Sequence, residues 1–164
     1  MLPYLPTTAK SFNDEPGLVA GSYLNHRYAI MRSELGHLCG YIEVPKESPA
    51  FGVSYSDLDF SVHGGLTYGR HAEAPLSGYW IGFDCAHSGD WVPGRSKLPE
   101  QIPDSAYRNL DYVRAECFKL IDQLIKYKPT TKVLLRQELL QVVEKFKEEE
   151  EYPGWKDAVQ TLWL

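Results

Sequence analysis

Side chains that could do chemistry gather in one stretch of this sequence, between Val62 and Trp91. A histidine followed by two glycines opens the stretch, and aspartate, cysteine and histidine follow one another near its end. Imidazole, thiolate and carboxylate groups bind divalent metals, and they also act as nucleophiles, acids and bases in enzymes. The residues that we predict to be catalytic are His63, Asp84, Cys85, His87 and Asp90.

A divalent metal is the cofactor that this composition predicts. His63, Cys85 and His87 offer the nitrogen and sulfur ligands that zinc prefers. The oxygen ligands that magnesium or manganese prefer could come from Asp57, Asp59, Asp84 and Asp90. A metal held here could activate water against a phosphate ester. We therefore predict a site for Zn, Mg or Mn, with His63, Cys85 and His87 as its ligands.

Two other roles for the same residues stay open. Cys85 could be a nucleophile if His63 or His87 acted as its base and an aspartate oriented the imidazole. No helix is predicted to begin just after Cys85, so nothing in the sequence lowers the pKa of its thiol. Alternatively, the cysteines are small buried apolar residues and the histidines only hydrogen-bond to loops.

A ligand-binding surface is predicted around the same stretch. Gly64 and Gly65 allow a ligand or another backbone to come close, and Arg70 could bind phosphate oxygens. The predicted ligand-binding residues are Gly64, Gly65, Thr67, Tyr68, Arg70 and Trp91. Aromatic side chains of the region could stack on a base, although such side chains also serve as core or cross-strand pairs. These aromatic residues are Tyr41, Tyr55, Tyr68, Tyr79 and Trp80.

Two β-hairpins are predicted to position these groups. Apolar and aromatic residues fill Phe60–Tyr68 and Gly78–Phe83, and a long polar connection joins them. Upstream, Arg27–Arg32 and His37–Val44 form a second pair of β-rich runs around a short turn that contains glycine. Residues 1–22 contain three prolines and two glycines, so we interpret them as an irregular arm.

The register of the hairpin at 60–83 decides which side chains meet. If Thr67 lies opposite Ile81, then His63 lies opposite Cys85, because opposite residues in an antiparallel pair keep a constant sum of positions. His63, Cys85 and His87 would then share a face. A slip of one residue would pair His63 with the preceding aspartate instead.

The second half of the sequence predicts helices. Apolar residues recur at three- and four-residue spacing from Leu110 to Leu124, which indicates a helix that begins at Asp104 or Ser105 and ends before Pro129. A second helix follows, capped by Thr130 or Thr131, and a short third one is predicted over 155–162. The apolar stripe of the second helix is Leu135, Leu139, Val142, Val143 and Phe146.

The predicted fold class is α+β. An antiparallel sheet of about four strands, made of two hairpins, occupies the N-terminal two-thirds, and two to three C-terminal helices pack on one face of it. With 164 residues we expect a single domain, in which 1–22 form the arm, 23–103 the sheet region and 104–164 the helical region.

Composition limits the classes of function. Apolar residues make up 43% of the chain, which is typical of a folded domain, and no apolar run approaches a membrane span. The N-terminus lacks the features of a signal peptide, and three cysteines fit a reducing compartment, so we predict a cytoplasmic protein that does not bind membranes. A formal charge of −5 argues against binding to duplex nucleic acid.

Two motifs carry a resemblance to a group of short proteins encoded by phages and bacteria. The first is HGGLTY at 63–68, and the second is WIGFDCAHSGD at 80–90. Cys39-Gly40-Tyr41 and Val44-Pro45 extend the likeness upstream, and it covers roughly Leu35 to Leu124. The resemblance implies an accessory phage or prophage protein that works in the host cytoplasm, and it does not by itself assign a reaction.

Three classes of function follow. The first is a small metal-assisted hydrolase that acts on a phosphate-containing small molecule or a nucleotide. The second is a non-catalytic protein that captures a nucleotide or a signalling molecule. The third is a protein-binding inhibitor of a host enzyme, in which the cluster of aspartate, histidine and cysteine is only structural. The density of these residues at two strand ends favours the first, because sites tend to be built on the loops beyond strands.

Overall fold

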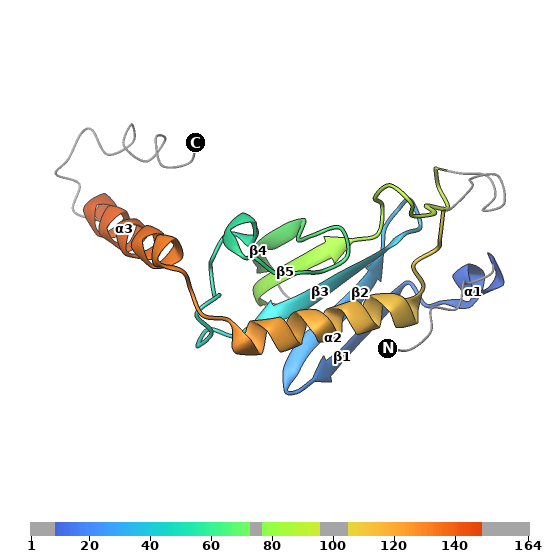
Figure 1. Ribbon diagram of the computed structural model, residues 1–164, viewed down its shortest axis with the longest axis horizontal. Coiled ribbons are helices and arrows are strands. Elements are labelled where there is room, and N and C mark those ends of the chain that lie inside the picture. The colour runs from blue at the N-terminus through green and yellow to red at the C-terminus, as the bar shows by residue number, and fades with distance from the viewer. Residues whose placement is uncertain (1–8, 73–76, 96–104, 149–164) are drawn as a thin grey trace. The chain divides into compact units, whose positions relative to one another are not determined.

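The computed structural model describes residues 9–72, 77–95 and 105–148, and it shows an α+β fold (Figure 1). The elements are, in chain order, α1 (Ala9–Asp14), β1 (Leu18–Tyr23), β2 (His26–Arg32), β3 (Leu38–Val44), the 3-10 helix η1 (Tyr55–Asp57), β4 (Tyr68–Ala72), β5 (Gly78–Asp84), α2 (Leu110–Lys126) and α3 (Thr131–Glu148). The strands form one five-stranded antiparallel sheet in the order β1-β2-β3-β5-β4. The chain divides into two compact units, residues 1–127 and 128–164, which we describe separately.

The upstream hairpin is confirmed as β2 and β3. Ile30 lies opposite Gly40, and Tyr28 lies opposite Ile42. Along β3 every second residue is buried and the residues between are half-buried. This alternation is the signature of a strand with one face on the core, and it agrees with the strands that the two β-rich runs predicted.

The predicted irregular arm contains a fifth strand, β1, which pairs with β2 along its whole length. The turn between them is Leu24-Asn25, and both residues have positive φ values of 48° and 63°. Two-residue hairpin turns of this kind are normally built from Asn-Gly or Asp-Gly. Since leucine stands first in this turn, the usual sequence signal for the hairpin is missing.

The hairpin at 60–83 required a larger correction. β5 lies where it was predicted, but its partner β4 begins only at Tyr68, and Gly69 rather than Thr67 lies opposite Ile81. Gly64 and Gly65 both have positive φ, which ends any strand before them. Residues 61–63 instead hydrogen-bond to side chains of α2.

Helix α2 packs across β2 and β3 and closes the core (Figure 1). It begins later than predicted, because the cap is Asn109, whose side chain accepts a hydrogen bond of 2.9 Å from the Tyr112 backbone N–H. The apolar stripe predicted for this helix is buried. Its buried residues are Val113, Cys117, Leu120, Ile121 and Leu124. Against them the sheet places Ile30, Ile42, Ile81 and Phe83, all at most 1% exposed.

The second unit contains α3, and the predicted cap is confirmed. The Val133 backbone N–H donates to Oγ1 of Thr130 at 3.4 Å. The predicted apolar stripe is not buried: Leu135 is 60% exposed and Val142 is 49% exposed. The predicted helix at 155–162 lies outside the described residues. Neither α2, α3 nor any other described helix combines the length and the apolar character needed to cross a membrane.

Candidate functional site

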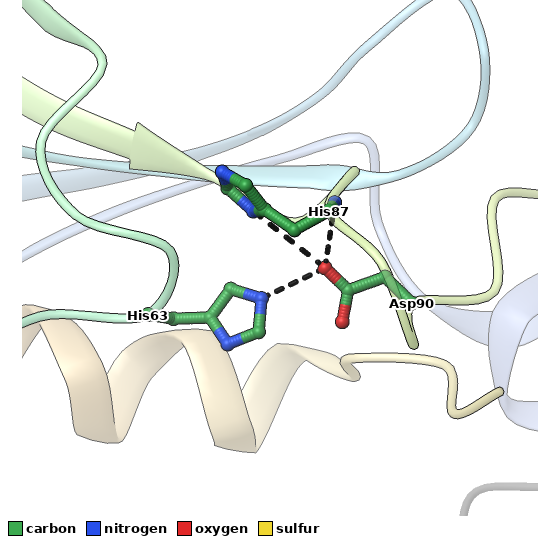
Figure 2. A group of neighbouring side chains, drawn as sticks. All are labelled: His63, His87 and Asp90. Atoms are coloured by element: carbon green, nitrogen blue, oxygen red, sulfur yellow. Dashed lines mark hydrogen bonds and ion pairs between the residues drawn. The ribbon is translucent and has the colours of Figure 1, made fainter. Parts of the chain in front are cut away.

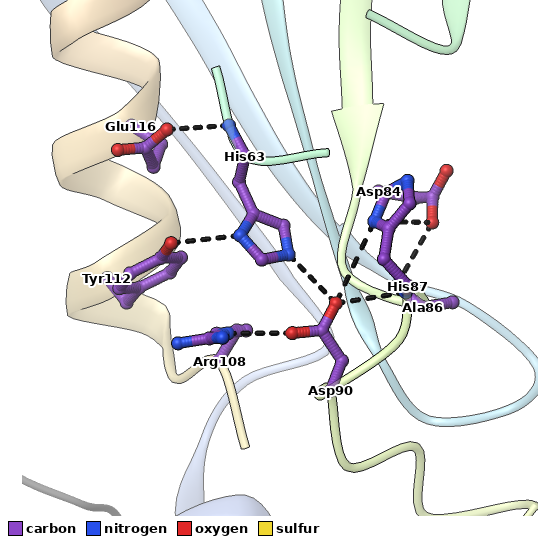
Figure 3. Close-up of polar contacts among 8 residues, drawn as sticks. All are labelled: His63, Asp84, Ala86, His87, Asp90, Arg108, Tyr112 and Glu116. Carbon is purple, nitrogen blue, oxygen red and sulfur yellow. Dashed lines mark hydrogen bonds and ion pairs between the residues drawn. The ribbon is translucent and has the colours of Figure 1, made fainter. Parts of the chain in front are cut away.

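Asp90 is the centre of a polar cluster beyond the end of β5 (Figure 3). Its Oδ2 accepts a hydrogen bond of 2.8 Å from Nε2 of His63 and one of 3.0 Å from the backbone N–H of His87. Its Oδ1 accepts a hydrogen bond of 2.7 Å from Nε of Arg108. The carboxylate itself is fully shielded from solvent.

The charge state of Asp90 follows from these contacts. Burial raises the pKa of the carboxyl, but hydrogen bonds from His63, Arg108 and the His87 backbone outweigh burial and lower the pKa to about 2. Asp90 is therefore an anion at neutral pH, and an anion only accepts hydrogen bonds. It follows that Nε2 of His63 carries the ring proton that Asp90 accepts.

His63 is fixed from three sides. While Nε2 donates to Asp90, Nδ1 lies 2.9 Å from the hydroxyl of Tyr112 and accepts its proton. The backbone N–H of His63 donates to Oε2 of Glu116 at 2.7 Å. Only 12% of the His63 side chain is exposed. Segment 61–63 therefore lies along α2, and the helix sets the orientation of the imidazole.

Two backbone contacts of Asp90 bring His87 and Arg108 to the cluster. The Asp90 backbone N–H donates to the carbonyl of His87 at 3.0 Å, which closes a turn over the two residues between them. Asp90 also forms an isolated parallel bridge with Ala106. This bridge places the segment that leads into α2, and with it Arg108, beside the carboxylate.

His87 faces His63 with ring centroids 5.5 Å apart (Figure 2). Its Nδ1 is 3.7 Å from Oδ2 of Asp90 and 3.9 Å from Oδ1 of Asp84. Both distances are too long for hydrogen bonds, and this buried nitrogen has no hydrogen-bond partner among the described residues. The His87 ring packs on Gly64, where a Cβ atom would lie 2.0 Å from Cε1 of the imidazole.

These contacts explain why residue 64 is a glycine. Gly64 is required both for its positive φ of 64° and for the space that the His87 ring occupies. Gly65 also has positive φ, but nothing lies within 4 Å of the position that its Cβ would take. Gly64 therefore belongs to the architecture of the cluster, whereas Gly65 serves the turn.

Three side chains offer possible metal ligands within 4.8 Å of one another, and these are His63, His87 and Asp90 (Figure 2). In a tetrahedral site, ligand atoms stand about 3.3 Å apart. The separation of 2.8 Å between His63 and Asp90 is shorter, and that of 3.7 Å between His87 and Asp90 is longer. Small side-chain movements would bring both to the required spacing, with an ion in place of the proton on Nε2 of His63.

The predicted place of Cys85 in this site needs correction. Cys85 follows β5 in the alternation of Ile81 and Phe83 and is 1% exposed, so its thiol points into the core. Burial, followed by the nearby charge of Asp90, raises the pKa of this thiol far above its ordinary value. A neutral buried thiol is a poor nucleophile and a poor metal ligand.

Asp84 stands at the edge of the cluster. Its Oδ1 accepts a hydrogen bond of 3.0 Å from the Ala86 backbone N–H, which shapes the turn after β5 (Figure 3). Asp84 alternates to the face of the sheet opposite to Cys85, as predicted from the strand pattern. Its carboxylate supports the loop that carries His87.

The predicted ligand-binding residues divide between several places. Trp91 is 5% exposed and packs against Phe12 and Tyr107, so it belongs to the core rather than to a binding surface. Thr67 is exposed beside the end of β5, where its backbone N–H donates to the carbonyl of Gly82 at 2.9 Å. Tyr68 and Arg70 lie on β4, on the face of the sheet that α2 does not cover.

Sequence reasoning missed three members of the cluster, one from the segment before α2 and two from the first turns of α2. Arg108, which precedes the helix cap, binds Asp90, whereas Tyr112 binds the ring of His63 and Glu116 binds its backbone. Tyr112 and Glu116 are four residues apart, which places both on one face of the helix next to the apolar stripe. That spacing is a signal in the sequence, but nothing in it says which strand ends the face will meet.

Comparisons with known proteins add no relative: no family model matches the chain, and neither the curated proteins nor the solved structures searched include a similar one.

Proposed function

We propose that this protein is a small metal-assisted hydrolase that acts on a phosphate-containing small molecule or a nucleotide. In this proposal His63, His87 and Asp90 bind one divalent metal ion. The observation that carries it is the convergence of two imidazoles and an ionised carboxylate, with the Nδ1 of His87 buried and unpartnered beside the other two. A buried polar atom without a partner is costly, and a bound ion would satisfy it.

The surroundings of His63 fit this role. If Nε2 bound an ion, the ring proton would move to Nδ1, and the Tyr112 hydroxyl at 2.9 Å would accept it instead of donating. A histidine that binds metal usually donates its other nitrogen to a fixed partner in this way. Arg108 holds the second oxygen of Asp90, so both ligands are already oriented. No existing hydrogen bond is lost except the one that the ion replaces.

The ligand set narrows the choice of ion. Two imidazole nitrogens and one carboxylate suit zinc or manganese better than magnesium, which prefers oxygen ligands and near-octahedral geometry. With Cys85 in the core, the predicted set of two histidines and a cysteine changes to two histidines and an aspartate. We therefore expect zinc to bind most tightly, since affinity for nitrogen ligands rises toward the end of the series.

The net charge that the site would have with a bound ion supports a phosphate-containing substrate. A divalent ion beside one carboxylate and two neutral imidazoles leaves a net positive site, which attracts phosphate oxygens. When bound, such an ion polarises a phosphoryl oxygen and makes an attacking water more acidic. One third of the His87 side chain is exposed, so water and substrate can reach this side of the cluster. The accessory role in phages that the resemblance implies is compatible with this chemistry and is part of the proposal.

Elemental analysis tests the proposal directly. Protein stripped with chelator and reloaded with zinc, manganese or magnesium should hold about one zinc per chain. His87→Ala should weaken zinc binding by tenfold or more. His71→Ala is the matched control, because His71 is exposed on β4 and belongs to no candidate ligand group among the described residues. Zinc-loaded wild type and the control should hydrolyse an activated phosphodiester, and His87→Ala should not.

Two outcomes would overturn the proposal. One is the absence of bound metal in folded wild-type protein after reloading with each of the three ions. The other is stoichiometric zinc in His87→Ala with unchanged affinity. Circular dichroism of each variant distinguishes a lost ligand from a lost fold, and His87→Ala is suited to this because its side chain is only partly buried.

A further inference from the structure

A second candidate site lies on the face of the sheet opposite to α2. Residues that alternate to this face form a half-open pocket of about 290 Å³, lined by Ala29, Met31, Tyr41, Tyr68, Ala72 and Trp80. None of the six belongs to the cluster around Asp90. A volume close to 300 Å³ is at the lower end for small-molecule sites, so the pocket suits a single ring system.

The residues that lie opposite one another on the strands shape this pocket. Tyr41 and Tyr68 both lie opposite Gly82, and the Tyr41 ring lies over this glycine. A Cβ on Gly82 would lie 2.5 Å from Cδ1 of Tyr41. The two tyrosine rings meet edge to face at 5.2 Å and 83°, and so they form two walls of a corner. The small side chains of Ala29 and Ala72 keep the rest of the pocket open.

The walls of this pocket offer flat aromatic surface. Tyr41 is half-buried, and burial raises the pKa of its hydroxyl far above the ordinary value, so the ring stays neutral. Trp80 is only 4% exposed and forms the floor of the pocket, where a hydrogen bond of 3.1 Å from Nε1 to the carbonyl of Ser77 fixes its indole. Neutral, fixed aromatic walls are suited to a planar ring that stacks or meets them edge to face.

The charge beside the pocket identifies the kind of ligand. The guanidinium of Arg27 stands 5.4 Å from the Trp80 ring, but it is hydrogen-bonded twice to Glu43, so its charge is compensated. The guanidinium of Arg70 stands 5.1 Å from the Tyr68 ring, and no ion pair in the described part of the chain involves it. Within the described part of the chain, Arg70 is therefore a cation at the edge of the pocket that no ion pair compensates, while the carboxylate of Asp84 acts on the Tyr41 hydroxyl from the same face.

We propose that this pocket binds a nucleoside monophosphate, with the base against Tyr41, Tyr68 and Trp80 and the phosphate on Arg70. One uncompensated arginine matches one phosphate group, and the volume matches one base. A nucleic-acid strand would need several cations along its backbone, and the formal charge of the chain is −5. The proposal does not rest on the metal site.

Titration calorimetry with the four nucleoside monophosphates tests the assignment, using the full chain in the presence of chelator. Tyr68→Leu should weaken binding by about tenfold through lost stacking. Arg70→Gln should weaken the binding of the monophosphate by about tenfold and leave the affinity for the parent nucleoside unchanged. The control is His71→Gln, because His71 neighbours Arg70 on β4 but alternates to the other face. His87→Ala should bind like wild type, which separates this site from the metal site.

Several outcomes would overturn this proposal. They are the absence of binding for all four monophosphates at millimolar concentration, and an equal loss of nucleoside and monophosphate affinity in Arg70→Gln. If the folded Tyr68→Leu variant bound the monophosphates with wild-type affinity, that result would also overturn the proposal. Affinity for single-stranded oligonucleotides that grows with their length would show that a strand, rather than a mononucleotide, occupies this face.

Discussion

The two histidines of the cluster differ in what surrounds them. His63 uses both ring nitrogens in hydrogen bonds, to Asp90 and to Tyr112, whereas Nδ1 of His87 has no hydrogen-bond partner among the described residues. A histidine with both nitrogens engaged has one orientation and one tautomer. His87 is therefore the residue whose state a ligand would change most.

The three cysteines also differ, and their environments predict their reactivity. Cys85 and Cys117 are at most 1% exposed, and burial raises the pKa of the Cys117 thiol to about 12. Cys39 is only half-buried, and burial raises its pKa less. We expect a thiol reagent at pH 8 to modify one cysteine in the native protein and all three in denaturant, because the reactive species is the thiolate.

Mass spectrometry of the labelled protein would identify the modified residue. The matched variant is Cys39→Ser, which should leave no thiol that reacts in the native state. A second thiol that still reacts quickly in Cys39→Ser, and that maps to Cys85, would show that this residue is accessible. Such a result would reopen the hypothesis of a catalytic cysteine.

At the scale of the elements, the two long helices play different parts. Helix α2 places its apolar stripe on the sheet, and its Tyr112 and Glu116 side chains hydrogen-bond to His63. Helix α3 leaves Leu135 and Leu139 at 60% and 42% exposure. The two helices have similar apolar periodicity, but the apolar residues of α2 contribute more to the free energy of unfolding, since this contribution follows the apolar area removed from water.

Alanine substitutions in the two helices should show this difference. Leu120→Ala in α2 should lower the free energy of unfolding by about 3 kcal/mol, because Leu120 is fully buried and its removal leaves a cavity. Leu135→Ala in α3 should change it by less than about 0.5 kcal/mol. Urea titration followed by tryptophan fluorescence measures both. A comparable loss in Leu135→Ala would mean that this side chain is buried in solution, against its exposure in the structure.

At the scale of the whole molecule, the division after Tyr127 separates the sheet, α2 and both candidate sites from the second unit. All residues that bind Asp90 lie within the first unit. The same is true of the six residues that line the pocket. Among the residues that the structure describes, those assigned to the cluster around Asp90 and to the pocket all belong to the first unit.

A chain that ends at Tyr127 should consequently fold and keep the first unit's cooperative unfolding. Its melting curve, recorded by circular dichroism, should stay sigmoidal, and zinc content after reloading should equal that of the full chain. The variant Leu120→Ala in the same shortened chain is the control for a lost core. Aggregation or a flat melting curve of the shortened wild type would mean that residues 128–164 stabilise the first unit.

Much of the local structure could be predicted from the sequence. Runs of β-forming residues bounded by turn signals identified β2, β3 and β5, and three- and four-residue spacing identified α2 and its buried stripe, because both signals follow from local backbone preferences. His63 was predicted to lie beside the segment that follows β5, and the structure brings it within reach of His87 and Asp90, although the strand pairing on which that prediction rested does not include residue 63. These features depend on neighbours within one or two elements.

Only the tertiary structure decided which side chains complete the site. Glu116 and Tyr112 bind His63 from a helix some fifty positions away in the chain. Arg108 reaches Asp90 because Asp90 and Ala106 form an isolated bridge, which no local sequence pattern predicts. Alternation along β5 places Cys85 on the same face as Ile81 and Phe83, but the tertiary structure decided that α2 covers this face and buries the thiol. The sequence by itself therefore determined the periodic elements and the chemical types present. Long-range packing chose the partners, because a hydrogen bond between distant segments depends on how whole elements dock and not on the residues next to it.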